Sequence, residues 1–274
     1  MGTSKRERQK QNKSAAREAQ ARAARRAKVR GRATKWGGLA AVLIVALFAV
    51  SQFDGGNSSS DTTDAVTDST AAETTALSTV PGAQITGKTP CPATDGSQER
   101  ATSFENAPAT CIDAKKSYTA VFDTTEGEIV VDLDTKKTPD TVNNFVVLSR
   151  YKYYDGSYVF RTDPSIDIIQ GGGASNTDDP GYSIKDEGTG FKYKEGDLVM
   201  ARTSAPDSAG GQWFFVAGEK ASLLDSQGTY VTFGRVSKGI DVVKAILALN
   251  SGAGDLGGAP SRPVKINSVT IQES

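Results

Sequence analysis

The stretch that decides the fold reads YTAVFDTTEGEIVVDLD and spans residues 118–134. YTAVFD at 118–123 and EIVVDLD at 128–134 alternate apolar and polar side chains, a period of two that is typical of strands with one buried face. The residues between them, TTEG, form a short connection that ends in glycine and indicates a hairpin. The sequence therefore predicts two antiparallel strands joined by a tight turn.

The residues that follow predict more short strands and two helices. TPD at 138–140 marks the first helix, because proline suits the first turn and Thr138 or Asp140 can cap its free amides. The apolar stripe of this helix consists of Val142, Phe145, Val146 and Leu148. Strands are predicted at 158–161, 166–171, 198–201, 213–216, 230–236 and 263–272, and a second helix at 239–249. This pattern indicates a mainly β domain, a closed antiparallel barrel with two capping helices.

The composition excludes several kinds of catalysis. The chain of 274 residues has no histidine and only two cysteines. It therefore has no imidazole base, no Ser-His-Asp triad and no zinc site built from histidines or four thiolates. Any reaction must use carboxylates, Arg or Lys, hydroxyls, amides or an apolar pocket. We expect no metal and no cofactor.

The N-terminal region predicts a membrane anchor. Residues 1–36 contain 13 Lys and Arg against two Glu, a net charge of +11 that the rest of the chain balances. The uncharged run GGLAAVLIVALFAVSQF at 37–53 follows, at the short end of what spans about 30 Å of hydrocarbon. A basic flank predicts a cytoplasmic N-terminus, with the remainder of the chain outside. A cleaved signal peptide is the alternative. We expect the arm to bind anionic headgroups rather than nucleic acid, because no aromatic platform accompanies its charges.

Residues 54–90 have the composition of a disordered linker. Of these residues 14 are Ser or Thr and none is aromatic, so the segment cannot bury enough apolar surface to offset its chain entropy. The next segment, 91–117, begins at Cys91 and contains Cys111. Outside the cytoplasm two cysteines most simply form a disulfide, while free thiols are the alternative. We interpret this segment as a stapled extension before the barrel.

Six motifs in the second half of the chain point to a known family. They are TPDTVNNFVVLSRYKYYDG from residue 138, VFR at 159–161, IIQGGG at 168–173, LVMA at 198–201, GGQWFFV at 210–216 and YVTFGRV at 230–236. In order and spacing these motifs resemble the cyclophilin family of peptidyl-prolyl cis–trans isomerases. The resemblance covers about residues 118–272 and implies that 118–274 is an isomerase domain. It also implies an eight-stranded barrel with a substrate groove on its outer face.

The resemblance implies a catalytic arginine and two supporting glutamines. Arg161 falls on the family's catalytic arginine, and Gln170 on the glutamine that orients it. Gln212 falls on the glutamine that hydrogen-bonds the substrate backbone. The reaction suits a chain without histidine, because twisting an X–Pro bond requires no covalent step. A guanidinium aimed at the prolyl nitrogen stabilises the twisted bond more than the planar one.

The resemblance also implies an apolar pocket for the proline ring, with some departures from the family. Phe214 matches the pocket phenylalanine, Leu224 a pocket leucine, and Ala201 the alanine after a short strand. Ile168 stands for a methionine and Tyr230 for the usual histidine. Three departures remain. The spacing from Arg161 to Gln170 is one residue longer than usual, so the family's second pocket aromatic falls on Ile166 or Asp167. Arg202 replaces an asparagine of the substrate groove, and Leu223 replaces a tryptophan.

The sequence therefore predicts a membrane-anchored isomerase of cyclophilin type that acts outside the cytoplasm. Its partners would be Pro-containing secreted or envelope polypeptides, and we expect a monomer. The alternatives are a catalytically weak cyclophilin-fold module that binds Pro-containing chains, and a scaffold in which the basic arm carries the function.

Overall fold

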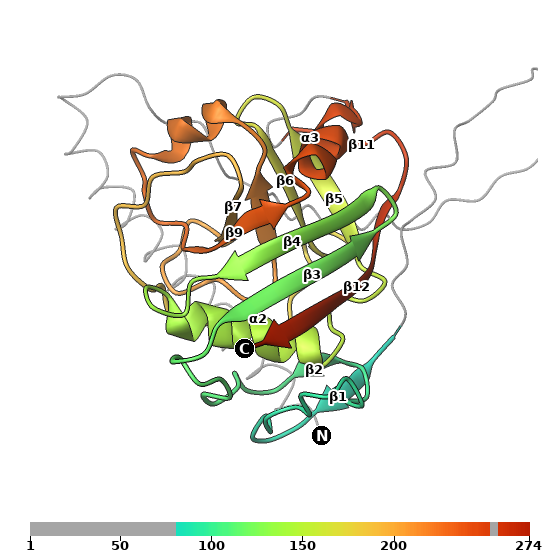
Figure 1. Ribbon diagram of the computed structural model, residues 1–274, viewed down its shortest axis with the longest axis vertical. Helices are drawn as coiled ribbons and strands as arrows, with labels where there is room; N and C mark the ends of the chain where they lie inside the picture. The colour runs from blue at the N-terminus through green and yellow to red at the C-terminus, as the bar shows by residue number, and fades with distance from the viewer. Residues whose placement is uncertain (1–80, 253–256) are drawn as a thin grey trace, which may run out of the picture. The chain divides into compact units, whose positions relative to one another are not determined.

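Eight strands close into a barrel in the structure, a computed structural model that describes residues 81–252 and 257–274 (Figure 1). The order around the barrel is β12–β3–β4–β9–β7–β8–β6–β5, and every neighbouring pair is antiparallel. The strands are β3 (Tyr118–Thr124), β4 (Gly127–Leu133), β5 (Tyr158–Asp163), β6 (Ile168–Gly173), β7 (Asp197–Met200), β8 (Trp213–Val216), β9 (Thr232–Lys238) and β12 (Val264–Glu273). The predicted mainly β barrel is confirmed.

The first hairpin forms as its alternation predicts. Strands β3 and β4 pair in continuous register, with Phe122 opposite Ile129, and both side chains are buried in the barrel. The Phe122 ring contacts three other aromatic rings, those of Phe145, Trp213 and Phe215, at centroid distances of 5.9, 5.3 and 5.2 Å. Large aromatic side chains supply much of the apolar area that such a core buries. The barrel interior is therefore a packed core rather than a ligand cavity.

Two α-helices lie near opposite ends of the barrel (Figure 1): α2 (Pro139–Arg150) and α3 (Ile240–Ala248). The predicted caps of the first helix are wrong. The side chain of Thr138 makes no capping bond, and instead the carboxylate of Glu187 accepts hydrogen bonds from the backbone N–H groups of Asp140 (3.1 Å) and Thr141 (2.9 Å). A carboxylate also complements the positive end of the helix dipole. A residue about 46 positions away in sequence thus does the work expected of a local cap.

Other boundaries differ from the sequence prediction in informative ways. β6 begins at Ile168 rather than residue 166, because residues 164–167 form a turn in which Asp167 has φ of 49°. The predicted disordered linker at 54–90 is wrong for its last residues, since Ala83–Ile85 form β1. β1 pairs in parallel with β2 (Ala101–Phe104). Three short elements complete the list: the 3₁₀ helix η1 (Glu219–Leu224), β10 (Asn250–Ser251) and β11 (Ala259–Pro260).

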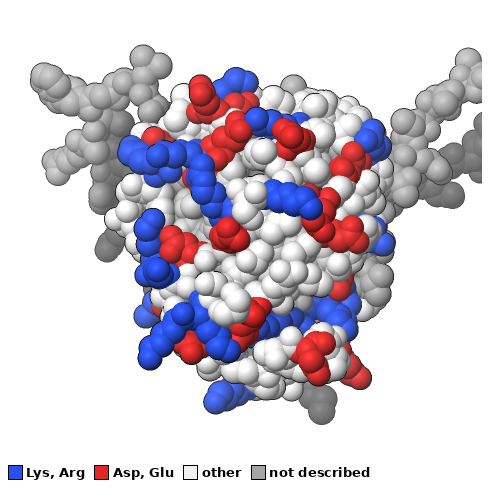
Figure 2. All heavy atoms as spheres, viewed as in Figure 1, with Lys and Arg blue, Asp and Glu red and all other residues white. Residues whose placement is uncertain are grey.

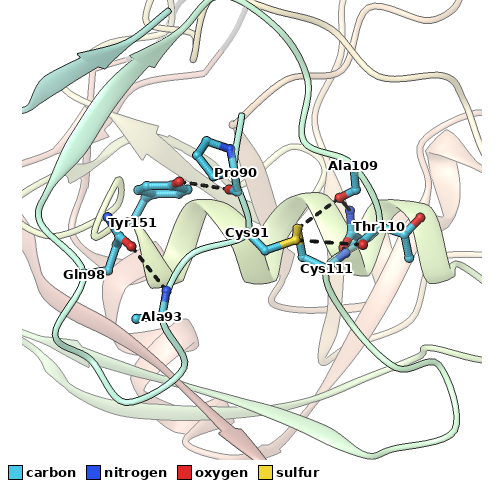
Figure 3. The surroundings of a disulfide bond; sticks show 9 residues. Pro90, Cys91, Ala93, Gln98, Ala109, Thr110, Cys111 and Tyr151 are labelled. Atoms are coloured by element: carbon cyan, nitrogen blue, oxygen red, sulfur yellow. Dashed lines mark hydrogen bonds between the residues drawn. A yellow bond between two sulfur atoms is a disulfide. The ribbon is translucent and has the colours of Figure 1, made fainter. Parts of the chain in front are cut away.

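The stapled extension docks onto α2 and the turn that follows it (Figure 3). Cys91 and Cys111 form a disulfide, as predicted. The hydroxyl of Tyr151 donates to the Pro90 carbonyl at 2.9 Å. The Cys111 N–H donates to Oδ1 of Asn143 at 2.7 Å. The disulfide therefore closes a loop whose two ends, at Pro90 and at Cys111, are also hydrogen-bonded to the domain.

Charges of both signs are interspersed on the face crossed by β3, β4 and β12 (Figure 2). Ion pairs contribute to this mixture: Lys238–Glu128 at 3.1 Å is exposed on both sides, and the exposed Arg262 lies 2.7 Å from the less exposed Glu126 carboxylate. Exposed pairs of this kind typically contribute about 0–1 kcal/mol. The stability of the barrel therefore rests on its apolar core.

Among the described residues, no helix is long and apolar enough to cross a membrane. The predicted arm at 1–36, the predicted span at 37–53 and most of the predicted linker lie outside the described residues.

We expect maleimide to label Cys91 and Cys111 in the native protein only after reduction. Closing this loop contributes about 3 kcal/mol by the chain-entropy model, so reduction should lower the melting temperature measured by circular dichroism. The Cys91→Ser/Cys111→Ser double variant is the matched control and should melt at the reduced protein's temperature with or without reductant. Full labelling before reduction would contradict the bridge.

Candidate active site

Strand alternation gives the barrel a second apolar cluster on its outer face. In β6 and β8, Ile169, Trp213 and Phe215 point into the barrel core, while their neighbours Ile168 and Phe214 point the other way. Seven buried residues form this outer cluster: Ile168, Tyr193, Val199, Phe214, Val216, Ala221 and Leu224. Four partly buried residues pack against them: Ile166, Phe191, Ala201 and Tyr230. An apolar surface of this kind suits a small ring such as that of proline.

Aromatic rings fix one wall of the outer cluster. Tyr230 lies edge-on to Phe214 with ring centroids 5.7 Å apart, and Tyr193 lies 6.5 Å from Phe214. The Tyr193 hydroxyl donates to the Tyr230 carbonyl at 3.1 Å and accepts from the Tyr230 N–H at 2.9 Å. Burial raises the pKa of Tyr193 to about 12, so the hydroxyl stays protonated at neutral pH and both bonds persist. Tyr230 is thereby held beside the phenylalanine ring.

A row of cross-strand neighbours leads into the outer cluster, and its first members, Arg161 and Gln170, form the polar row. Cross-strand pairing places Arg161 of β5 opposite Gln170 of β6, Gln170 opposite Phe214 of β8, and Phe214 opposite Val199 of β7. Neighbouring strands lie about 4.8 Å apart, so Arg161 and Phe214 start about 10 Å from each other on the same face. The row therefore sets a cationic group and an apolar surface within the span of a dipeptide.

Side-chain hydrogen bonds join the polar row into a network. Nη1 of Arg161 donates to Oε1 of Gln170 at 2.9 Å, and Nε2 of Gln170 donates to Oε1 of Gln212 at 3.0 Å. Nε2 of Gln212 donates in turn to the carbonyls of Asn176 (3.0 Å) and Asp178 (2.8 Å). These bonds fix which way each amide faces, because each donor meets an acceptor. The guanidinium is consequently oriented through two glutamines by the backbone of residues 176–178.

Asp163 holds the other side of the guanidinium, and it had no place in the sequence prediction. Nη2 of Arg161 lies 2.8 Å from Oδ2 of Asp163, two residues further along β5 on the same face. Burial raises the pKa of Asp163, but hydrogen bonds from Ser165 and Arg161 outweigh that effect and hold the pKa below its ordinary value. The carboxylate is therefore ionised at neutral pH. A signal was present in the sequence, since strand residues two apart share a face.

Every pocket residue predicted from the resemblance lies in or against the outer cluster, apart from Arg202, which lies at its edge. Of the two candidates for the second pocket aromatic, Ile166 packs against the cluster, whereas the Asp167 carboxylate accepts from the backbone N–H and Nζ of Lys220. The Arg202 guanidinium lies 5.9 Å from the centre of the Tyr230 ring and 3.5 Å from the Asp186 carboxylate. It therefore braces the edge of the cluster.

The sequence prediction missed part of the cluster. Val199 and Val216 could have been predicted, because strand residues two apart share a face. Val199 lies two residues before Ala201, and Val216 lies two residues after Phe214. Tyr193 carried no such signal, since it lies in the long connection between β6 and β7. Leu223, by contrast, is the large hydrophobic side chain that the described residues leave exposed, at 67%. Among the described residues no group of three or more His, Cys, Asp and Glu could hold a metal ion.

Comparison with known proteins agrees with this geometry. Residues 119–271 match the family model for "Cyclophilin type peptidyl-prolyl cis-trans isomerase/CLD". Peptidyl-prolyl cis-trans isomerase A of Dickeya dadantii is 33% identical over 168 residues, covering 58% of this chain and 86% of its own. A peptidyl-prolyl cis-trans isomerase of Acinetobacter baylyi is 37% identical over 153 residues, covering 53% of this chain and 81% of its own.

Solved structures show the same fold. Two crystal structures of a cyclophilin type isomerase from Cryptosporidium parvum, one of them in the presence of the dipeptide Ala-Pro, superpose with TM-scores of 0.51 and 0.50. Their sequence identities are 24% and 25%, and the matches cover 58% and 57% of this chain and 99% of theirs. With its barrel, its outer cluster and the family match over residues 119–271, this chain belongs to the cyclophilin-type peptidyl-prolyl cis–trans isomerases.

Proposed function

We propose that the outer cluster holds the proline ring of a polypeptide substrate while Arg161 stabilises the twisted X–Pro bond, and that this happens outside the cytoplasm. The observation that carries the proposal is the cross-strand row from Arg161 through Gln170 to Phe214. It sets a fixed cation beside a fixed apolar surface. The X–Pro bond of a bound chain would lie between them.

The chemistry follows from amide resonance. Rotation about a peptide bond has a barrier of about 20 kcal/mol, because the C–N bond loses its partial double-bond character. In the twisted state the lone pair is localised on the prolyl nitrogen. A guanidinium directed at that nitrogen then gains an interaction that the planar state does not offer, which is the condition for lowering the barrier. Arginine suits this role because it stays charged and its fork of donors is planar.

The network around Arg161 would keep this geometry fixed before a substrate arrives. Its side chain is 20% exposed and is held by Gln170 and Asp163 at separate nitrogens. A pre-oriented group needs little reorganisation during the reaction. The side chain of Gln212 has both amide hydrogens bonded to backbone carbonyls, so we infer that it orients Gln170 and shapes the site. A direct bond from Gln212 to substrate would require one of these bonds to open.

The substrates we propose are Pro-containing secreted or envelope polypeptides. The Cryptosporidium relative crystallised in the presence of Ala-Pro supports a proline-containing ligand. The disulfide supports a site outside the cytoplasm, because disulfides persist in oxidising compartments. The basic arm and uncharged run at 1–53 support a membrane anchor with a cytoplasmic N-terminus. X–Pro bonds exchange over tens of seconds, which makes a catalyst useful to chains folding there.

We expect Arg161→Ala to lower kcat/KM at least about tenfold in a proline-isomerisation assay on the full-length protein. Tenfold corresponds to about 1.4 kcal/mol of transition-state stabilisation, a modest demand for a charged donor in a partly buried site. Arg161→Lys should restore little, because an ammonium lacks the planar fork. Arg262→Ala, which removes an exposed arginine paired with Glu126, is the matched control and should retain wild-type activity. Wild-type activity in Arg161→Ala would refute the mechanism.

We expect the isomerisation rate to be flat between about pH 6 and pH 8. The pKa of Asp163 lies below its ordinary value and the pKa of Tyr193 is about 12, so the first stays ionised and the second stays neutral across this range. The check is kcat/KM measured across the range at constant ionic strength. A bell-shaped profile would require an acid–base group that this mechanism does not contain.

We expect external protease to release the isomerase domain from intact cells or spheroplasts. The net charge of +11 before an uncharged run of 17 residues is the basis of this expectation. The measurement is immunoblotting of the released fragment, with a cytoplasmic protein as the control for lysis. A domain that is cleaved only after lysis would contradict the proposed topology.

A further inference from the structure

The guanidinium of Arg161 is one half of a partly buried ion pair. Its Nη2 lies 2.8 Å from Oδ2 of Asp163, and the side chains are 20% and 7% exposed. Such a pair is poorly screened compared with a surface pair. A substrate lying beside Arg161 would therefore experience the field of both members, a cation and an anion a few ångströms apart.

The structure holds the carboxylate in this position independently of Arg161. Oδ1 of Asp163 accepts hydrogen bonds from the N–H of Ser165 at 3.0 Å and from its hydroxyl at 2.5 Å. Gly257, which has a φ of +81°, packs so closely that a Cβ there would lie 2.8 Å from Cβ of Asp163. The two hydrogen bonds from Ser165 hold the Asp163 carboxylate beside the guanidinium. The negative charge is a fixed part of the site.

The position of the pair favours a role in recognition over a role in stability alone. A salt bridge that served only to join neighbouring strands could lie anywhere on the surface, as Lys238–Glu128 does between β9 and β4. This pair occupies the end of the row that leads through Gln170 to Phe214. With strands about 4.8 Å apart, a proline bound at Phe214 would place the residue before it within about 10 Å of both charges.

We propose that Asp163 determines how the enzyme responds to substrate charge, by balancing Arg161 so that the residue before proline is accepted whether it is acidic, neutral or basic. The inference rests on the proposed function of Arg161. Removing the carboxylate would add one positive charge to the balance beside the substrate, which favours an acidic residue over a basic one. With the carboxylate present, the two fields largely cancel at the distance of the neighbouring residue.

The experiment compares substrates on one enzyme, so that any loss of folded protein cancels. Wild type, Asp163→Asn and Arg161→Ala of the full-length protein are assayed at low ionic strength with three peptides that differ only in the residue before proline: Glu, Ala or Lys. The control variant is Glu128→Gln, which changes the net charge equally but alters an exposed pair elsewhere on the barrel. We expect wild type and Glu128→Gln to show Glu-Pro to Lys-Pro ratios of kcat/KM within about twofold of one.

For Asp163→Asn we expect the Glu-Pro to Lys-Pro ratio to rise at least about threefold over wild type, and the rise to shrink in high salt. An unchanged ratio would overturn the inference. So would a steep charge preference in wild type, a test that needs no variant. If Arg161→Ala is impaired while the Asp163→Asn ratio stays at the wild-type value, only this inference fails. If Arg161→Ala keeps wild-type activity, the proposed function fails with it.

Discussion

The site depends on one constraint: strands β7 and β8 of the barrel are buried on both faces. In β8, Trp213 and Phe215 fill the barrel while Phe214 and Val216 fill the outer cluster. Because side chains alternate at a period of two, a slip of one residue in the pairing of this strand would exchange the two sets. It would place the large Trp213 ring on the outer face and empty the core. The apolar content of the strand therefore fixes the register, and the register fixes the site.

The same register supplies the polar half of the site. Gln170 is the pivot, because its strand neighbours are Arg161 on one side and Phe214 on the other. The network continues past the barrel to the carbonyl of Asp178. Two residues further on, the carbonyl of Pro180 accepts from the N–H of Phe104 in β2 at 2.7 Å. The segment clipped by the disulfide is thus joined to the arginine by a continuous set of bonds, although it lies outside the barrel.

The sequence alone predicted features that depend on neighbouring residues. It did not predict contacts between segments that lie far apart in the chain. Alternation was enough for the first hairpin. Motif order pointed to Arg161, Gln170 and Phe214, which the structure brings into one cross-strand row, while their roles stay predictions. The N-terminal contact of α2 was not predicted, because Glu187 arrives from a loop far along the chain. Tyr193 was missed for the same reason. The choice between Ile166 and Asp167 needed the turn at 164–167, in which Asp167 has a positive φ and directs its carboxylate to Lys220.

A chain without histidine is well matched to a reaction that moves no proton. Rotation about an X–Pro bond changes shape and charge distribution only, so the enzyme needs a surface and a field rather than an acid and a base. We propose that the surface is the outer cluster, in which the Tyr193 hydroxyl holds Tyr230 beside Phe214. In the mechanism that we propose, the field comes from Arg161, and Asp163, 2.8 Å away, would limit how far it extends. A cation that must act on one nitrogen gains selectivity when a fixed anion cancels its charge for everything farther away.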